Sequence, residues 1–262
     1  MEVVSETMDG SRSAPLVVAR GGAADVAPTH TIAALEAALE VGADALWLGI
    51  QLSKDGHPVV LGGPSLDRVT DGGGHVGALT VRELKRLDAG GWMAARFRGQ
   101  RIQTLPEVLE RFRDRTRFWL ELANVEEASS TTPSPTIEEK VISTLEIYDA
   151  VAVSVVASAR RQSLARLRAW NVEVGLAAVW TGGALQEALP EAGVARALCV
   201  EGRLVTTDTL ARIRAAGLEC HVQIDDEPAL ADRLILHGVD GHGVDGIITG
   251  RPEPWLARMG RR

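Results

Sequence analysis

Histidine and aspartate recur at a fixed spacing near the end of the sequence. Residues 237–241 and 242–246 carry the same five letters, His-Gly-Val-Asp-Gly. His237, His242, Asp240 and Asp245 are side-chain types that bind divalent metal ions, so the chemistry to consider is metal binding. A tandem duplication explains the spacing without chemistry, and an added turn before the last strand is well tolerated. We therefore interpret the segment as a loop insertion.

Neither the cysteines nor the glycine run predicts a redox or nucleotide site. Cys199 and Cys220 are the only cysteines, and each lies in an apolar, strand-like run. We expect both to be reduced core residues. Gly72-Gly73-Gly74 follows no strand and opens no helix, so it lacks the context of a dinucleotide-binding turn and is interpreted as a flexible loop. No cofactor is expected.

Composition excludes several classes of protein. The chain has 262 residues and a formal net charge of −7, which argues against a nucleic-acid surface. No apolar run approaches the roughly 20 residues that a membrane-spanning helix needs. Residues 1–15 are polar and acidic, without the basic start and apolar block of a signal peptide, so we expect a cytoplasmic protein. The sequence does not indicate an oligomeric state.

The elements that must position any site alternate between strand and helix. Apolar runs predict strands at 16–20, 45–52, 117–123, 150–157, 172–179, 197–200, 219–224 and 246–249. Helical periodicity predicts helices at 31–41, 81–87, 105–113, 136–148, 162–169, 183–189, 207–216 and 228–236. Eight such units in about 250 residues favour a (β/α)8 barrel over a doubly wound open sheet. We expect a disordered tail at 1–14 and one barrel domain at 15–262.

One stretch, Gly42 to Gly63, departs from the simple alternation. Ala45–Leu52 predicts a buried strand, Ser53-Lys54-Asp55-Gly56 a tight turn, and His57–Leu61 a return strand. The segment that follows is rich in glycine and turn residues. We therefore expect a small insertion at about 53–104, after the second strand.

The same stretch and several others resemble the glycerophosphodiester phosphodiesterase (GDPD) family. The resemblance covers nearly the whole chain and rests on segments in the family's order and spacing: Leu66–Thr70, Thr80–Leu84, Leu87–Trp92, Phe97–Leu105, Ser163–Leu167 and Gly243–Thr249. It implies a TIM-like (β/α)8 barrel of the PLC-like phosphodiesterase type. It also implies an enzyme that uses a divalent cation and two histidines.

At the positions where the family carries these groups, the sequence differs. Ala19 and Gly62 stand where the resemblance places the catalytic histidines, and Trp47 and Gly49 where it places a metal-binding Glu and Asp. Further departures fall at Thr29, His30, Gly63, Ala123, Ala157, Ala159, Gln223 and Gly250. Of the polar inner residues, Arg20 and Glu121 remain. The resemblance is thus to a divergent member, without a metal site and without expected glycerophosphodiesterase activity.

Small residues and one tryptophan at these positions predict a roomier, drier pocket. We interpret the chain as a repurposed barrel that binds an apolar small molecule and converts it without metal, by a cyclisation or isomerisation in a biosynthetic pathway. Arg20 and Glu121 are the candidate catalytic residues. The candidate ligand-binding residues are Trp47, Gly49, Gly62, Ser158, Trp180, Gln223 and His30. Two alternatives stay open: a non-catalytic pseudoenzyme with a binding or regulatory role, and a phosphodiesterase that uses a shifted site.

Overall fold

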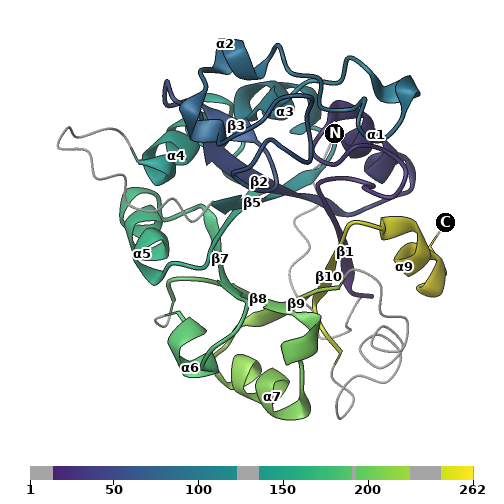
Figure 1. The fold of residues 1–262 in the computed structure, drawn as a ribbon. Coiled ribbons are helices and arrows are strands. Elements are labelled where there is room, and N and C mark those ends of the chain that lie inside the picture. Colours follow the sequence, from purple (N-terminus) through teal and green to yellow (C-terminus); the bar gives the residue numbers. More distant parts are fainter. Residues whose placement is uncertain (1–13, 123–135, 191–192, 225–242, 262) are drawn as a thin grey trace.

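Parallel strands form a closed barrel in the computed structural model, which describes residues 14–122, 136–190, 193–224 and 243–261 (Figure 1). The strands are β1 (Leu16–Arg20), β2 (Ala45–Leu52), β3 (Pro58–Val60), β4 (Gln103–Thr104), β5 (Arg117–Leu122), β6 (Ser154–Ser158), β7 (Gly175–Trp180), β8 (Ala197–Glu201), β9 (Glu219–Gln223) and β10 (Gly246–Thr249).

The barrel closes because β1 pairs in parallel with both β2 and β10. From β2 the ring continues through β5, β6, β7, β8 and β9 to β10, and every one of these pairings is parallel. The ring therefore contains eight strands, as in other barrels of the TIM type. The sequence-based prediction of the fold class is confirmed.

Helices cover the outside of the ring (Figure 1). They are α1 (Ile32–Glu40), α2 (Val81–Leu84), α3 (Leu105–Phe112), α4 (Ile137–Ile147), α5 (Arg161–Trp170), α6 (Leu185–Ala188), α7 (Thr207–Ala215) and α9 (Pro252–Arg258), with 3-10 turns at Val76–Ala78, Ala95–Phe97 and Gly202–Leu204. The largest apolar cluster joins the helices to the outward face of the strands. None of the described helices is long and apolar enough to cross a membrane.

A second apolar cluster fills the inside of the barrel, because alternate residues of each strand point inward. Trp47 and Trp119 belong to this cluster and stack with their ring centroids 6.0 Å apart. Trp119 also contacts the imidazole of His221, at 4.4 Å between centroids. The interior of the barrel is thus a packed core rather than a channel.

The insertion after β2 forms its own small core. β3 pairs antiparallel with β2, and β4 pairs antiparallel with β3. Buried apolar residues between Val59 and Ile102 make a third cluster under the glycine-rich loops. These extra strands lie outside the ring, so they add to the barrel without interrupting its parallel order.

The structure corrects the boundaries of two predicted strands and adds one helix. The strand predicted at 150–157 begins only at Ser154, because Asp149 adopts a left-handed backbone and a turn follows it. The strand predicted at 172–179 is shifted to Gly175–Trp180. Helix α9, which begins with Pro252 in its first turn, was not predicted. The tail expected at 1–14 lies outside the described residues except for Ala14, and the helix expected at 228–236 lies outside them altogether.

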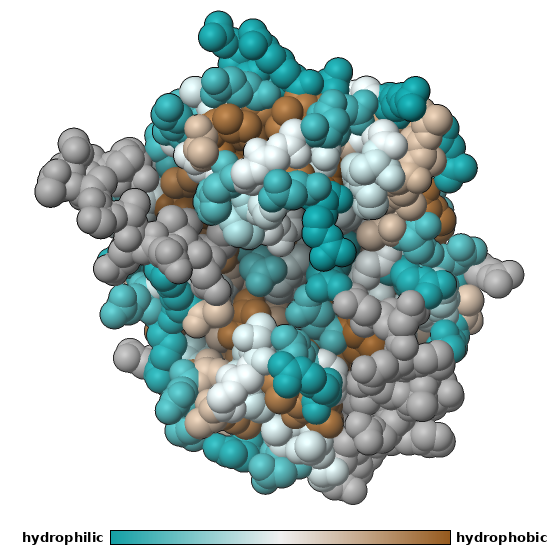
Figure 2. All heavy atoms as spheres, viewed as in Figure 1, coloured by the Kyte–Doolittle hydropathy of each residue, from teal (hydrophilic) through white to brown (hydrophobic). Residues whose placement is uncertain are grey.

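Hydrophilic residues dominate the surface seen along the same direction. Figure 2 shows that the hydrophobic areas in view are small and separated by hydrophilic side chains. The apolar residues of the sequence are therefore used mainly in the three clusters described above.

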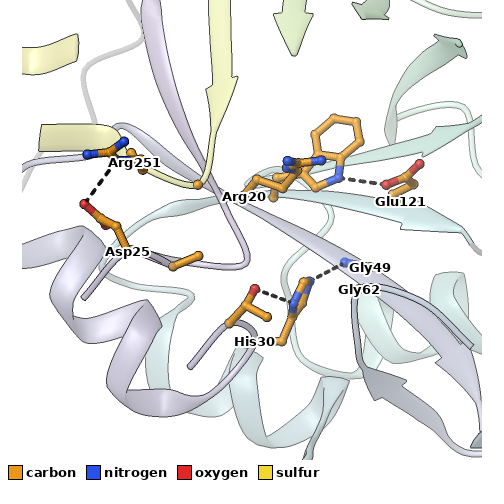
Figure 3. A pocket seen from close by; sticks show the side chains of 11 residues that line it. Arg20, Asp25, His30, Gly49, Gly62, Glu121 and Arg251 are labelled. Atoms are coloured by element: carbon orange, nitrogen blue, oxygen red, sulfur yellow. Dashed lines mark hydrogen bonds and ion pairs between the residues drawn. The ribbon is translucent and has the colours of Figure 1, made fainter. Parts of the chain in front are cut away.

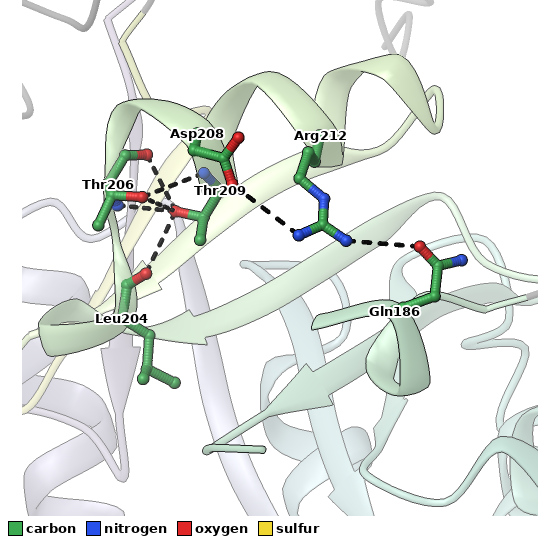
Figure 4. Close-up of polar contacts among 6 residues, drawn as sticks. All are labelled: Gln186, Leu204, Thr206, Asp208, Thr209 and Arg212. Atoms are coloured by element: carbon green, nitrogen blue, oxygen red, sulfur yellow. Dashed lines mark hydrogen bonds and ion pairs between the residues drawn. The ribbon is translucent and has the colours of Figure 1, made fainter. Parts of the chain in front are cut away.

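Helix α7 begins with a reciprocal cap (Figure 4). The Thr206 hydroxyl accepts from the Thr209 backbone N–H at 3.1 Å, and the Thr209 hydroxyl accepts from the Thr206 N–H at 2.7 Å. Arg212, one turn further, donates to Gln186 of α6 at 3.5 Å. The cap satisfies backbone donors that the first helical turn leaves without partners.

Replacing Thr206 with Ala is expected to lower the free energy of unfolding by about 1 kcal/mol, because it removes a side-chain acceptor at the helix start. Urea denaturation followed by circular dichroism measures the change. Thr207→Ala is the matched control, since the Thr207 side chain is exposed and has no hydrogen-bonding role in the cap. Equal stability of the two variants would show that the cap contributes nothing.

Candidate active site

A pocket of about 430 Å³ lies at the carboxyl ends of the barrel strands (Figure 3). Arg20 is the last residue of β1, Glu121 lies near the end of β5, and Gly250 directly follows β10. The pocket is lined by Arg20, Ala24, Asp25, Thr29, His30, Trp47, Gly49, Gly62, Glu121, Gly250 and Arg251. This end of a parallel barrel is where active sites of such folds are found.

Glu121 is the acidic group inside the pocket. Its Oε2 accepts a hydrogen bond from the Trp47 indole Nε1 at 2.9 Å. Partial burial raises the pKa of the Glu121 carboxyl, while the Trp47 hydrogen bond and the charge of Arg20 act in the opposite direction. The proton therefore stays on this carboxyl to a higher pH than on an exposed glutamate, as a general acid requires.

His30 lies in a seat made by glycines (Figure 3). Its Nε2 accepts from the Gly49 backbone N–H at 3.2 Å, and its Nδ1 lies 2.9 Å from the Thr29 hydroxyl. A Cβ on Gly62 would come within 2.7 Å of the ring, and one on Gly21 within 2.8 Å. The imidazole thus occupies space that side chains at these positions would need.

The hydrogen bonds assign one neutral form to His30. Because the Gly49 N–H donates to Nε2, that nitrogen carries no proton, and the ring proton lies on Nδ1 toward Thr29. Burial, and secondarily the charge of Arg20, lower the pKa of His30 to about 4. The backbone of His30 is left-handed, with φ of 62°, so the surrounding contacts hold it in a conformation that non-glycine residues seldom adopt.

This environment makes stability depend on pH in a definite direction. Above pH 6.5 His30 is neutral in both the folded and the unfolded chain. Between pH 6.5 and 4 only the unfolded chain gains the proton, so the free energy of unfolding falls as pH falls; the loss is complete below pH 4. The full loss amounts to at most about 3 kcal/mol.

The check compares wild type and His30→Gln by denaturation at pH 7.5 and pH 5. The wild type is expected to lose more stability than the variant over this range, because the wild-type chain takes up one proton at residue 30 when it unfolds and the variant does not. An NMR titration of the His30 ring, with an apparent pKa near the usual 6.5, would contradict the assignment.

Two further charged residues stand at the edge of the pocket. Arg251, just after β10, lies 3.7 Å from Asp25 in the loop after β1. The backbone joins the same two loops, because the Ala24 N–H donates to the Gly250 carbonyl at 2.8 Å. The pocket therefore presents two guanidinium groups and two carboxylates, and the expectation of a dry, apolar pocket was wrong.

The described residues do not fit a divalent cation. Such an ion needs several hard ligands, and no group of three His, Cys, Asp or Glu residues within the described part of the chain could hold one. Inside the pocket Glu121 is a single carboxylate, and both ring nitrogens of His30 have partners. The guanidinium of Arg20 shares the same space. The reaction proposed for these residues therefore assigns no step to a cation.

Most of the residues singled out from the sequence meet at this pocket. Arg20, Glu121, His30, Trp47 and the glycines at 49 and 62 all line it. The pairing of β1, β2 and β5 in one continuous part of the ring brings them together. What each of them does to a ligand stays a prediction.

Three other predicted residues lie elsewhere. Trp180 and Ser158 were expected at the pocket, but strand alternation turns them away, since Val179 and Ala157 point into the barrel instead. Trp180 packs in the outer core, and the Ser158 hydroxyl accepts from the Arg160 N–H at 3.1 Å. Gln223 has the same strand parity as the inward-facing His221, but it does not line the described pocket.

Sequence reasoning missed Asp25 and Arg251. Both lie on loops that follow strands β1 and β10, which neighbour each other only because the barrel closes. The sequence signal that could have identified them is their position, since they are charged residues that follow the first and the last barrel strands. Ala123, whose identity entered the sequence argument, lies outside the described residues.

Comparisons with known proteins agree with one another. The model of the glycerophosphoryl diester phosphodiesterase family matches residues 20–253. A glycerophosphodiester phosphodiesterase of Caldanaerobacter subterraneus is 39% identical over 163 residues, which is 62% of this chain and 65% of that protein. One of Bacillus subtilis is 28% identical over 95% of this chain and 89% of its own length.

A solved structure has the same fold. The Oleispira antarctica phosphodiesterase, determined in complex with its product sn-glycerol-3-phosphate, has a TM-score of 0.79 and 24% identity. The match covers 94% of this chain and 97% of that one. This likeness concerns the fold.

These findings correct the functional interpretation of the sequence. A repurposed barrel that cyclises an apolar compound, and a chain without expected glycerophosphodiesterase activity, are contradicted by relatives named as glycerophosphodiester phosphodiesterases. The motifs that carry the resemblance indicated the family correctly. The substitutions at a few positions were interpreted as a loss of the family's activity, and that interpretation is the one the relatives contradict. Because the family model matches the chain from residue 20 to residue 253, this protein belongs to the glycerophosphoryl diester phosphodiesterase family.

Proposed function

We propose that this chain binds a glycerophosphodiester in the pocket at the carboxyl ends of the strands and hydrolyses it to glycerol phosphate and an alcohol. The observation that carries the proposal is the position of Glu121, a partly buried carboxyl of raised pKa, beside the cationic Arg20. Family membership supports the reaction class, and the relatives' names support the substrate class.

Arginine is suited to the phosphate group of such a substrate. Arg20 and Arg251 both line the pocket, and a guanidinium can donate two parallel hydrogen bonds to phosphate oxygens. Arg251 is held near Asp25, which keeps its side chain at the edge of the pocket. A phosphodiester carries one negative charge, so the two cations would offset the cost of removing it from water.

Glu121 would supply the proton that the departing alcohol needs. A water oxygen attacks phosphorus, the bond between phosphorus and the leaving oxygen breaks, and that oxygen takes the proton of Glu121. The carboxylate then regains a proton from the water that attacked. Trp47 holds one carboxyl oxygen, which leaves the other for this transfer.

The substitutions inferred from the sequence affect which residues would carry out the reaction. We propose that Ala19, Trp47, Gly49 and Gly62 replace the family's histidines and metal ligands, and that the chain uses a shifted set of groups. The seat of His30 supports this view, since the ring occupies the space that a side chain at Gly62 would need and its Nε2 accepts from the Gly49 backbone N–H.

A second candidate function is binding of the same ligand without turnover. The observation that favours it is the donor set of the pocket, which does not fit a divalent cation within the described residues. The two candidates share the ligand and the arginines, and they differ only in whether product forms.

The test measures binding and hydrolysis of glycerophosphoethanolamine by the purified protein. Glycerol phosphate release is followed enzymatically, with EDTA, Mg²⁺ or Ca²⁺ added, and binding is followed by calorimetry. Arg20→Ala is expected to weaken binding at least 10-fold, whereas Arg86→Ala, on an exposed arginine of the insertion, should not change it. Binding without product supports the second candidate, and no binding at all overturns both.

A further inference from the structure

A second cavity, of about 450 Å³, lies at the opposite end of the barrel. Its lining includes the first residues of β1, β2, β5, β6 and β7, namely Leu16, Ala45, Arg117, Ser154 and Gly175. It shares no residue with the pocket at the carboxyl ends. In barrels of this type the amino-terminal end commonly serves stability, so the proposed reaction does not account for this cavity.

Arginines dominate the charge of the cavity. Arg117, Arg168 and Arg196 line it together with the acidic Asp44 and Glu173. Asp44 is already neutralised by Arg261, whose guanidinium donates to both carboxylate oxygens at 2.8 and 2.5 Å. The remaining balance of the lining is therefore positive, although the chain as a whole carries a net charge of −7.

Two of these arginines are available to a ligand. Arg117 is exposed and forms no side-chain hydrogen bond or ion pair within the described residues. The Arg196 guanidinium lies 6.0 Å from the ring centre of Trp119, where the aromatic face favours a cation. Arg168, in contrast, donates to the carbonyls of Val194 and Val172, so it supports the wall of the cavity.

The wall also contains a polar group in need of a partner. The Ser154 hydroxyl is buried, and no hydrogen-bond partner is present for it among the described residues. Beside it, Gly175 packs closely on the Ser154 backbone, since a Cβ there would lie 3.2 Å from the Ser154 carbonyl oxygen and from the Val155 side chain. A buried hydroxyl without a partner costs free energy, which a ligand or ordered water would recover.

Inward-facing residues of neighbouring strands lie between the two cavities. Along β5, Arg117 and Trp119 line the amino-terminal cavity, and Glu121 lines the other. Trp119 stacks on Trp47, whose indole donates to Glu121. Two packed rings therefore separate the ends.

We propose that the amino-terminal cavity is a second ligand site, for a small molecule that bears a phosphate or carboxylate group. Arg117 and Arg196 bind the oxyanion, since guanidinium groups match the geometry of both anions. The volume is in the range of small-molecule sites. This site is independent of the proposed hydrolysis and stands even if that proposal fails.

The experiment titrates the full chain with inorganic phosphate and, separately, with succinate. The readouts are calorimetry and the indole N–H resonance of Trp119, identified by its through-space contact with His221. In the Arg20→Ala background, which weakens the first pocket, the Trp119 resonance is still expected to shift. Combining Arg117→Ala with Arg196→Ala should weaken this binding at least 10-fold, and Arg86→Ala should not.

The two anions distinguish the chemistry of the ligand. A stronger response to phosphate identifies a phosphorylated ligand, and a stronger response to succinate a carboxylate; either supports the site. The proposal is overturned if neither anion shifts Trp119, or if the double variant binds as tightly as Arg86→Ala. Loss of the shift in Arg20→Ala alone would place all binding in the first pocket and overturn it as well. Melting temperatures confirm that the variants fold.

Discussion

Replacing Glu121 with Gln is expected to lower the rate of glycerophosphodiester hydrolysis by about 10² to 10⁴-fold, the usual effect of removing a general acid. The amide keeps an oxygen that accepts from Trp47, so the pocket retains its shape. What it loses is the proton that the carboxyl delivers to the leaving oxygen. The measurement is the steady-state rate of glycerol phosphate release, at saturating glycerophosphoethanolamine.

The pH profile separates a chemical role from a structural one. Because burial raises the pKa of Glu121, the wild-type rate should fall as pH rises through that value, and Glu121→Gln should lose this limb. A group whose pKa is raised by folding also costs stability once it is ionised, so the variant is not expected to be less stable near neutral pH. Glu110→Gln, on the exposed face of α3, is the matched control.

An unchanged rate in Glu121→Gln would remove Glu121 from the mechanism. A rate that falls together with substrate affinity, while the shape of the pH profile is kept, would assign it to binding instead. If the wild type shows no turnover with EDTA, Mg²⁺ or Ca²⁺, binding of the diester is measured by calorimetry instead. In that case Glu121→Gln is expected to bind the diester more tightly only at pH values above the Glu121 pKa, where the wild-type carboxylate would repel the phosphate.

Replacing Gly22 with Ala is expected to lower the free energy of unfolding by about 3 kcal/mol or more. Gly22 has φ of 92°, a conformation that L-residues rarely adopt. In addition, a Cβ there would lie 2.4 Å from the backbone carbonyl of Ala34 in α1. The two backbones cannot both stay in place, so α1 must move away from the turn that follows β1.

The matched control is Gly63→Ala, since a Cβ at Gly63 meets no atom within 4 Å and its φ is not positive. Denaturation of both variants in urea gives the comparison. Because Gly22 lies two residues after Arg20 and supports the start of α1, its replacement should also disturb the seat of His30. Equal stability of the two variants would mean that α1 adapts without cost, and that its packing against β1 is looser than described.

Local pattern was enough to predict the barrel. Alternating strand and helix signals gave eight parallel units, and the structure contains eight strands in a closed ring. The signals fail where a turn has the composition of a strand: Val151 and Val153 are β-branched, yet the left-handed Asp149 delays β6 to Ser154. Hydrophobic periodicity contains no information on the backbone angle of a single residue, such as the positive φ of Asp149.

Strand parity explains the errors at the pocket. Trp180 was expected at the mouth because it lies at the end of a strand, but it packs in the outer core, since Ala177 and Val179 are the residues of β7 that face inward. Because successive residues of a strand face opposite sides, the position of a strand end does not by itself tell which residue points into the barrel. Arg20 and Glu121 have the strand parity of the inward-facing residues, and both line the pocket.

The sequence by itself determined the fold class, the family resemblance and the meeting of Arg20 with Glu121, since all three follow from the order of short segments along the chain. Only the tertiary structure decided which charges surround them. Asp25 and Arg251 come from opposite ends of the chain and meet because β1 and β10 pair. His30 receives its low pKa from burial, in a seat made by Gly21 after β1 and Gly62 after β3. Such contacts depend on ring closure and on excluded volume, and neither is a property of any one segment.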